Sequence, residues 1–158
     1  QTLLLTSPGN RGCQNGRRVI LMKLLISFFL VAMCVMIHAS GITWSLRRLN
    51  RSTKLADPRY WVQTWCLVQV AGWLIFLHLL EMSLWAFVFM YGQALPDLQS
   101  AFYFSSVTYT TVGYGDLVLP DKWRLVGGIE ALTGILMCGW STGFFFNVLS
   151  RTHESGQN

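Results

Sequence analysis

Three long apolar runs restrict this 158-residue chain to few folds. They cover residues 24–42, 65–91 and 125–149, and each is close to or above the roughly 20 residues that cross a bilayer as a helix. Only 12% of the residues are charged, whereas soluble domains carry about 25%. We therefore expect an all-α membrane protein with three transmembrane helices.

The segment Thr110–Asp116 reads Thr-Thr-Val-Gly-Tyr-Gly-Asp and lies between the second and third apolar runs. Its glycines, Gly113 and Gly115, stand at alternate positions and favour left-handed backbone conformations. Successive carbonyl groups would then point the same way, with the Thr111 hydroxyl at the end of the row. Such a column of oxygen atoms suits a cation. A simple turn is the alternative, but a turn does not explain the apolar runs on either side.

A short helix is predicted immediately before this segment, from Pro96-Asp97 to Tyr109. At about 1.5 Å per residue it would be only about 20 Å long, too short to cross the hydrocarbon core. A short helix is tolerated at membrane depth only where other parts of the protein surround it. Its C-terminal partial negative charge would favour a cation at that end. We therefore predict a re-entrant helix.

Taken together, these residues resemble the selectivity filter and pore module of potassium channels, over roughly residues 65–151. The chain looks most like the small prokaryotic members with one module per chain, preceded here by an additional helix. The resemblance implies that potassium is coordinated by the carbonyls of Thr111, Val112, Gly113 and Tyr114 and by the Thr111 hydroxyl. Since each chain supplies one filter strand, it also implies a homotetramer in the lipid bilayer.

The resemblance implies roles for residues outside the filter. Gly134 matches the hinge glycine of the family's inner helix. Residues at helical spacing from it give the candidates for the cavity and gate, which are Gly134, Ile135, Cys138, Thr142 and Phe146. Many family members have paired tryptophans where this chain has Tyr103 and Phe104, and some have an acid at Val107. Support of the filter is therefore expected from Tyr103 and Thr108.

The expected organisation follows the apolar runs. We predict, in order, a disordered or non-native extension at 1–21, an additional helix at 22–42, a basic loop at 43–64, the pore module at 65–151 and a short tail at 152–158. Within the module we expect an outer helix at 65–92, a pore helix at 97–109, the filter at 110–116 and an inner helix at 123–150. A secretory signal that ends near Gly41 is the competing interpretation of the first run.

Charge placement predicts the orientation. The loop after the first run holds five basic residues against one acidic residue, Asp57, and loops of this kind stay in the cytoplasm. The filter end would then face outward and the C-terminus would be cytoplasmic, in the plasma (inner) membrane. Arg48, Arg51 and Lys54 recur every third residue. Their neighbours are polar, which favours a solvated loop over a voltage sensor.

The second and third apolar runs contain three ionisable residues: His78, Glu81 and Glu130. Such groups are costly in hydrocarbon and usually face protein or water. We expect them to satisfy one another or the hydroxyls of Ser105 and Ser106, with a protonation-sensitive brace as the alternative. A metal site would have too few ligands.

The sequence therefore favours a potassium-selective channel, passing K⁺ passively. The alternatives are a weakly selective cation channel and a non-conducting partner subunit of another channel. We expect no enzymatic activity, no cofactor besides the permeant K⁺ and no nucleic-acid partner.

Overall fold

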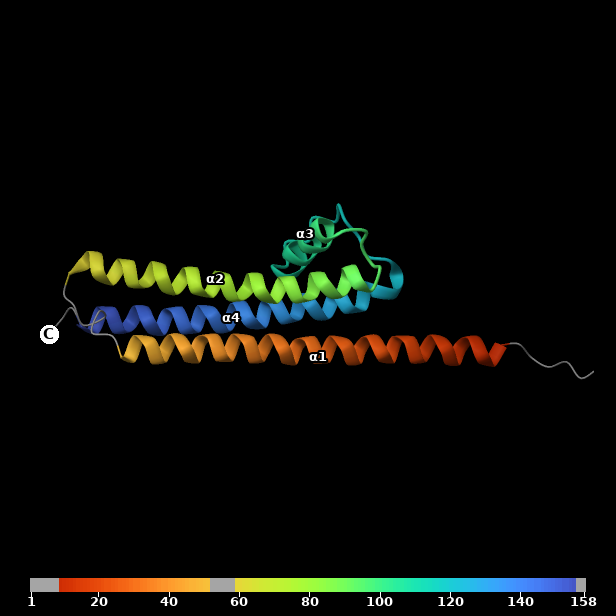
Figure 1. Ribbon diagram of the computed structural model, residues 1–158, viewed down its shortest axis with the longest axis horizontal. Helices are drawn as coiled ribbons and strands as arrows, with labels where there is room; N and C mark the ends of the chain where they lie inside the picture. Colours follow the sequence, from red (N-terminus) through yellow and green to blue (C-terminus); the bar gives the residue numbers. More distant parts are fainter. Residues whose placement is uncertain (1–8, 52–58, 156–158) are drawn as a thin grey trace, which may run out of the picture.

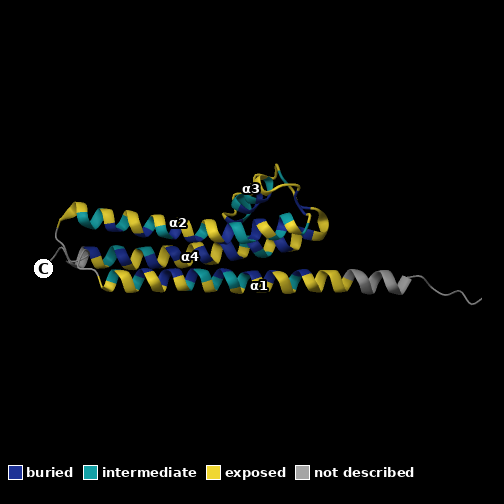
Figure 2. Cartoon of the chain, in the orientation of Figure 1, coloured by how far each residue is buried: buried dark blue, intermediate teal, exposed yellow. Residues whose placement is uncertain are grey.

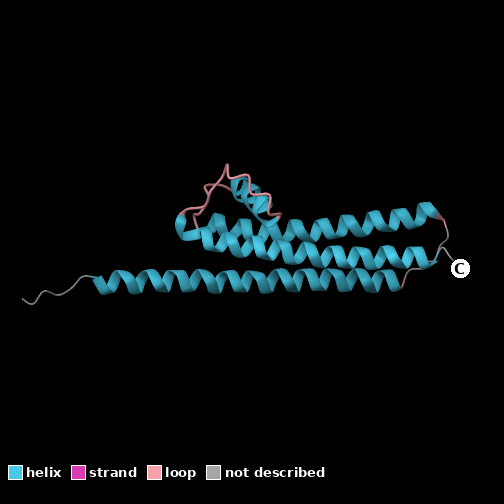
Figure 3. Cartoon of the chain, turned by 180° about the vertical axis from the view of Figure 1, so that it is seen from behind, coloured by secondary structure: helices cyan, strands magenta, loops and turns pink. Residues whose placement is uncertain are grey.

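The computed structural model describes the backbone of residues 9–51 and 59–155, and the side chains of 17–51 and 59–152. All regular elements in these ranges are helical, which confirms the all-α prediction. Three long helices lie side by side, and a short one packs on two of them near one end (Figures 1 and 3). The long helices are α1 (Gly9–Asn50), α2 (Tyr60–Tyr91) and α4 (Arg124–Ser155); the short one is α3 (Leu98–Tyr109), and the 3₁₀ turn η2 (Asp121–Trp123) leads into α4.

The three long helices are each long and apolar enough to cross a membrane, over residues 17–50, 60–91 and 121–152. Large apolar side chains also point outward: Phe28 and Phe29 are each 65% exposed, and Trp65 is 62% exposed. A soluble bundle would place such side chains inside, whereas lipid accommodates them. The chain is therefore a multi-pass membrane protein, as the sequence predicted.

Helix α1 joins the bundle through one narrow stripe. Its buried residues recur every three or four positions, so they share one helical face. Most of them are small or polar, and Figure 2 shows the burial concentrated where the helices meet. The stripe includes Lys23, Ser27, Leu30, Cys34, His38, Ile42 and Ser45. Helix α1 is therefore packed into the fold rather than lying loosely beside it.

The expectation of disorder over residues 1–21 is wrong for 9–21, because α1 begins at Gly9. Once the apolar run has nucleated a helix, each further residue adds a backbone hydrogen bond at little cost. Residues 1–8 lie outside the described part of the chain.

The expected loop at 43–64 is also too long. Helix α1 continues to Asn50, and α2 begins at Tyr60, five residues before the predicted position. For α1 the physical reason is packing, because Leu46 and Leu49 lie against the apolar cluster that α1, α2 and α4 form around Leu74. The dipeptide Asp57-Pro58, a pattern typical of a helix start, lies outside the described residues.

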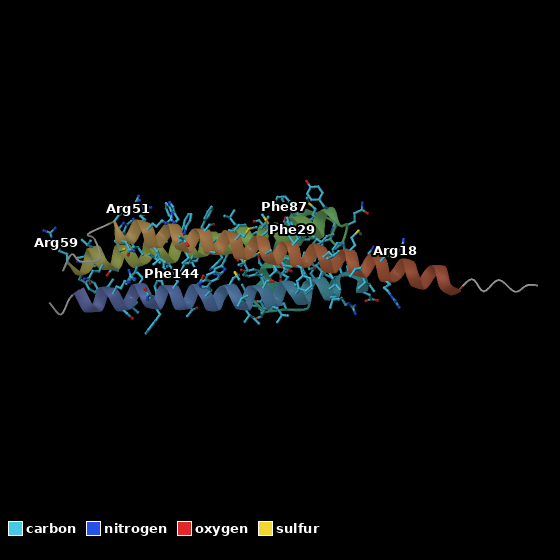
Figure 4. All side chains as sticks on the ribbon, turned by 90° about the horizontal axis from the view of Figure 1, so that it is seen from below. Arg18, Phe29, Arg51, Arg59, Phe87 and Phe144 are labelled. Atoms are coloured by element: carbon cyan, nitrogen blue, oxygen red, sulfur yellow. The ribbon has the colours of Figure 1, made fainter. Side chains whose placement is uncertain are left out.

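The ends of the other helices lie near their predicted positions. Helix α3 has Asp97 as its N-cap, and α4 extends beyond the predicted 150 to Ser155. The basic residues gather at the two ends of the bundle. Figure 4 shows Arg51 and Arg59 at the end where α1 meets α2, and Arg18 toward the opposite end.

Candidate functional site

Helix α3 is fixed at its start by a side-chain cap. The Asp97 carboxylate accepts hydrogen bonds from the Ser100 backbone N–H at 2.8 Å and from the Ser100 hydroxyl at 2.9 Å. These bonds satisfy amide groups that a helix start otherwise leaves unpaired. They also lower the pKa of Asp97 below its ordinary value of 3.8. The cap thus sets where α3 begins. Because α3 is 12 residues long, its end at Tyr109 follows from that start.

The segment after α3 has an unusual backbone. Positive φ angles occur at every second residue: 61° at Thr111, 53° at Gly113 and 75° at Gly115. Glycine adopts this region at no steric cost, so the predicted left-handed conformation of both glycines is confirmed. Thr111 is β-branched, and a positive φ there is strained by about 1–3 kcal/mol. Strain of this size at Thr111, two residues before the first of two permissive glycines, makes the segment a candidate functional site.

Backbone hydrogen bonds fold the segment over the last turn of α3. The N–H of Thr111 donates to the Thr108 carbonyl at 2.9 Å, and the N–H of Gly113 donates to the Val107 carbonyl at 3.0 Å. Thr108, a predicted support, thus contributes its backbone. The residues from Thr111 to Asp116 are all exposed in the single chain, which leaves their outer side free for a partner.

Tyr103, the other predicted support, reaches the far end of the segment. Its hydroxyl donates to the Asp116 carboxylate at 2.6 Å, and the Leu117 N–H donates to the same carboxylate at 3.0 Å. The hydrogen bond from Tyr103 is the main reason that the pKa of Asp116 lies below its ordinary 3.8. A phenol–carboxylate hydrogen bond therefore fixes this end of the segment.

The last residue of α3 is held on two sides. Tyr109 is fully buried, and its backbone carbonyl lies against Gly134 of α4. Phe104, one turn earlier, packs edge-on against Phe89 of α2 with ring centroids 5.4 Å apart. Trp123 meets the same Phe89 ring at 6.1 Å. Aromatic and glycine contacts thus fix α3 between α2 and α4. Of the aromatics of α3, Phe104 and Tyr109 are buried, and Tyr103 is 39% exposed.

Five polar side chains, including that of Tyr109, form a group that is called the polar cluster here. Its members come from all four helices: His38 of α1, His78 and Glu81 of α2, Tyr109 of α3 and Ser141 of α4. His38 and Glu81 are fully buried, and the His78 side chain is 15% exposed. In this cluster His38 of α1 is hydrogen-bonded to Glu81, which also accepts a hydrogen bond from Tyr109 at the end of α3.

The contacts in the polar cluster form a ring. His38 Nδ1 lies 2.8 Å from Glu81 Oε1, and His38 Nε2 lies 2.9 Å from Ser141 Oγ. His78 Nε2 lies 3.0 Å from the same Ser141 Oγ, and His78 Nδ1 lies 3.2 Å from Tyr109 Oη. The Tyr109 hydroxyl closes the ring by donating to Glu81 Oε2. His78 and Glu81 share a helix face as expected, at 3.8 Å.

Glu130 is separate from the polar cluster. It is fully buried, and Ser105 of α3 is the side chain that interacts with its carboxyl group. Within the described residues neither group forms a hydrogen bond of normal geometry. The expected partnership between Glu130 and a serine of the short helix thus exists as proximity, whereas the serine hydroxyls, one of the two expected alternatives, are not the partners of Glu81. Glu81 pairs with His38 and Tyr109 instead.

The predicted cavity residues of α4 divide between two faces. Gly134 is buried against Tyr109. The other four are exposed along one side of the helix, with Ile135 58% and Phe146 67% exposed. They are Ile135, Cys138, Thr142 and Phe146. This open side of α4 has no covering element within the described chain.

Sequence reasoning missed three members of the polar cluster: His38, Tyr109 and Ser141. The competing signal interpretation of the first run would make His38 part of a cleavage site, and Tyr109 is predicted only as the end of the short helix. The available signal was the first run itself, where Ser27, Cys34 and His38 interrupt the apolar residues at helical spacing. Polar residues on one face of a membrane helix usually face protein.

Comparison with known proteins places these residues in context. A family model described as "Ion channel" matches residues 64–151. The Potassium voltage-gated channel protein Shal of Drosophila melanogaster is 30% identical over 94 residues. The match covers 54% of this chain and 16% of that protein, so the chain corresponds to a small part of that relative. No solved structure shows a significant match.

Proposed function

Because this chain belongs to the ion channel family, we propose that it is one subunit of a homotetrameric, potassium-selective channel. The observation that carries the proposal is the positive φ at Thr111, Gly113 and Gly115. Alternation of this kind lets successive carbonyls turn to one side of the chain. Similarity to a protein named as a potassium channel supports the choice of ion.

In this proposal Thr110–Asp116 is the selectivity filter. The carbonyls of Thr111, Val112, Gly113 and Tyr114, together with the Thr111 hydroxyl, replace the hydration shell of K⁺. The C-terminus of α3 faces the ion from below with its partial negative charge. The Tyr103–Asp116 hydrogen bond, at 2.6 Å, keeps the outer end of the strand in place.

The tetramer follows from what one chain leaves uncovered. Val112 is 53% and Tyr114 71% exposed, and the open face of α4 carries Leu132 at 68%. One strand cannot surround an ion, whereas four strands around an axis can. Neighbouring subunits would bury the filter side chains, and the open face of α4 with Ile135, Cys138, Thr142 and Phe146 would line a central cavity.

The proposed orientation places the filter outward and the junction of α1 and α2 in the cytoplasm. Arg51 and Arg59 lie at this junction (Figure 4). Arg47 and Arg48 belong to the last turn of α1, and Arg48 lies over the Trp44 ring at 5.4 Å. Basic residues beside a membrane helix retain their loop in the cytoplasm. Helix α3, enclosed by α2 and α4, then enters and leaves from the outer side as a re-entrant helix in the plasma membrane.

A flux assay tests the proposal. The purified chain in liposomes is expected to pass K⁺ down its gradient, whereas Gly113→Ala and Gly115→Ala should abolish flux while the tetramer still forms. Both variants force a Cβ onto a left-handed backbone, at about 1–2 kcal/mol per residue. Gly72→Ala is the matched control, because Gly72 is helical and a Cβ there meets nothing within 4 Å.

The same assay separates the alternatives. Equal K⁺ and Na⁺ flux through the wild type would indicate a weakly selective cation channel. No flux alone, with flux restored by a second channel chain, would indicate a partner subunit. Selective conduction by either filter variant would contradict the proposal directly.

A further inference from the structure

The hydrogen bonds of the polar cluster can be assigned by counting protons. An ionised Glu81 only accepts, so the Tyr109 hydroxyl donates to it. The single phenolic proton is then used, and the contact between His78 Nδ1 and Tyr109 Oη is a hydrogen bond only if His78 donates. A neutral His78 therefore carries its proton on Nδ1, and its Nε2 is an acceptor that faces Ser141.

Ser141 decides how the ring closes. Its hydroxyl has one proton, which goes to His78 Nε2. The Ser141 oxygen must then accept from His38 Nε2. His38 Nε2 thus carries a proton, and a second proton lies between His38 Nδ1 and Glu81 Oε1.

The ring therefore holds one proton more than an ionised Glu81 and two neutral histidines would supply. As long as His78 is neutral, either His38 is an imidazolium beside the Glu81 carboxylate, or Glu81 is protonated beside a neutral His38. Both forms satisfy every contact and leave the polar cluster without net charge. Without this proton, one histidine Nε2 is an unpaired acceptor and the buried cluster is negative, which costs free energy on both counts.

No other described group takes over this proton. The titratable side chains that interact with the cluster are Cys34 of α1 and Cys138 of α4, and Cys34 in turn interacts with Glu130 of α4; none of the three is a cation. The Trp140 ring lies 5.6 Å from the His38 ring and adds no donor to the ring of hydrogen bonds. The described ion pairs and hydrogen bonds of the cluster include no lysine or arginine.

The polar cluster ends at the base of the proposed filter. Tyr109 is the last residue of α3, and Thr110 begins the segment with alternating φ. The position of Tyr109 is thus fixed by Gly134 at its backbone and by Glu81 and His78 at its hydroxyl. Glu81 and His78 are in turn joined through His38 and Ser141.

We propose that His38 of α1 is a positioning residue for the filter, acting through a proton that it shares with Glu81. The proposal rests on the proposed function of Thr110–Asp116. It makes α1 part of the conducting unit: His38 joins α1 to the same ring of side chains that holds Tyr109. Loss of the shared proton opens the ring and releases the filter-bearing end of α3.

The variant that tests the proposal most sharply is Glu81→Gln. A glutamine amide donates to His38 Nδ1 and accepts from Tyr109, so the ring closes without the extra proton and without charge. Glu81→Gln should keep K⁺ over Na⁺ selectivity within about twofold. Glu81→Leu and His38→Leu leave buried partners unpaired and should lower selectivity by about tenfold or more. His153→Gln, a histidine of the C-terminal end of α4, is the control.

The pH dependence separates positioning from a general structural role. At a pH high enough for the wild type to lose selectivity, Glu81→Gln should retain it, because its ring needs no shared proton. If Glu81→Gln fails at the same pH as the wild type, the proposal is wrong. Equal loss of selectivity in Glu81→Gln and Glu81→Leu would also contradict it, as would wild-type selectivity in Glu81→Leu.

A spectroscopic measurement tests the hydrogen-bond assignment independently of ion conduction. In ¹⁵N-histidine-labelled protein in lipid, with signals assigned by His38→Leu and His153→Gln, the His78 proton is expected on Nδ1. A proton on Nε2 would overturn the assignment, and so would stoichiometric zinc in the purified protein that Glu81→Gln removes. If the labelled protein gives the expected tautomer but passes no K⁺, the proposed channel function fails while the hydrogen-bond assignment stands.

Discussion

The backbone carbonyl of Tyr109 lies directly against Gly134, so that a Cβ at position 134 would overlap the carbonyl group. This contact joins α3 to α4 at the point where α3 ends and the proposed filter begins. Gly134 was expected to be a hinge on the cavity side of α4. The structure gives it a different place, because only a residue without a side chain lets the two backbones meet.

Gly134→Ala should therefore be one of the most damaging single changes in α4. The added methyl group forces α3 and α4 apart, at about 1–3 kcal/mol or more for overpacking. We expect a lower melting temperature of the purified protein in detergent and loss of K⁺ flux. Gly128→Ala is the matched control, since a Cβ there meets nothing within 4 Å. Equal stability of both variants would show that the contact is not needed.

Tyr103→Phe removes the hydrogen bond to Asp116 and should reduce K⁺ over Na⁺ selectivity at neutral pH without loss of the tetramer. The bond lowers the pKa of Asp116, so its contribution is present above the ordinary value of 3.8 and disappears as pH falls through the lowered pKa. Wild-type selectivity should thus decline only below pH 3.8. Reversal potentials recorded at several pH values on the outer side measure this selectivity. A Tyr103→Phe channel as selective as the wild type would show that the hydrogen bond to Asp116 does not support the filter.

Glu130 makes a prediction about stability. Its buried carboxyl and the Ser105 hydroxyl lack hydrogen bonds of normal geometry within the described residues. The desolvation of both groups is therefore not compensated by hydrogen bonds. The double variant Ser105→Ala, Glu130→Leu should be at least as stable as the wild type, whereas Glu130→Leu alone leaves the serine unpaired. The melting temperatures of the wild type, Glu130→Leu and the double variant test this prediction. A strongly destabilised double variant would mean that Glu130 has a partner in the assembled channel.

The backbone of the proposed filter segment was predictable at its glycines and not at Thr111. Gly113 and Gly115 indicate a left-handed conformation, because glycine adopts it freely. Thr111 has a φ of 61°, which no sequence rule predicts for a β-branched residue. Its conformation is imposed by the hydrogen bonds that fold the segment over α3.

The packing partners of α1 could not be predicted from the sequence either, because they also depend on tertiary contacts. The apolar run predicted a helix but not its neighbours, so the histidine at position 38 gave no indication of Glu81, 43 residues away. Helix length was underestimated because packing of Leu46 and Leu49 on α2 and α4 extends α1 past the apolar run. Tertiary contacts decide both points, and one sequence does not show them.

Phe146→Ala should raise the basal K⁺ flux. Phe146 is a large side chain, 67% exposed, on the face of α4 that would line the cavity near its cytoplasmic end. Four such rings would close the pore by excluding water. Phe144→Ala, in a buried residue of the same helix, is the contrasting variant and should lower stability instead. If flux through the closed channel does not change in Phe146→Ala, the gate lies elsewhere.

The most direct test of the central claim is the reversal potential of the purified wild-type protein in planar bilayers. With a tenfold K⁺ gradient and Na⁺ balancing the total salt, a potassium-selective channel should reverse close to about 59 mV, the equilibrium value for a tenfold ratio of a monovalent ion. Gly113→Ala should pass no such current. A reversal potential near zero, with clear current, would show that the channel does not distinguish K⁺ from Na⁺ and would contradict the account.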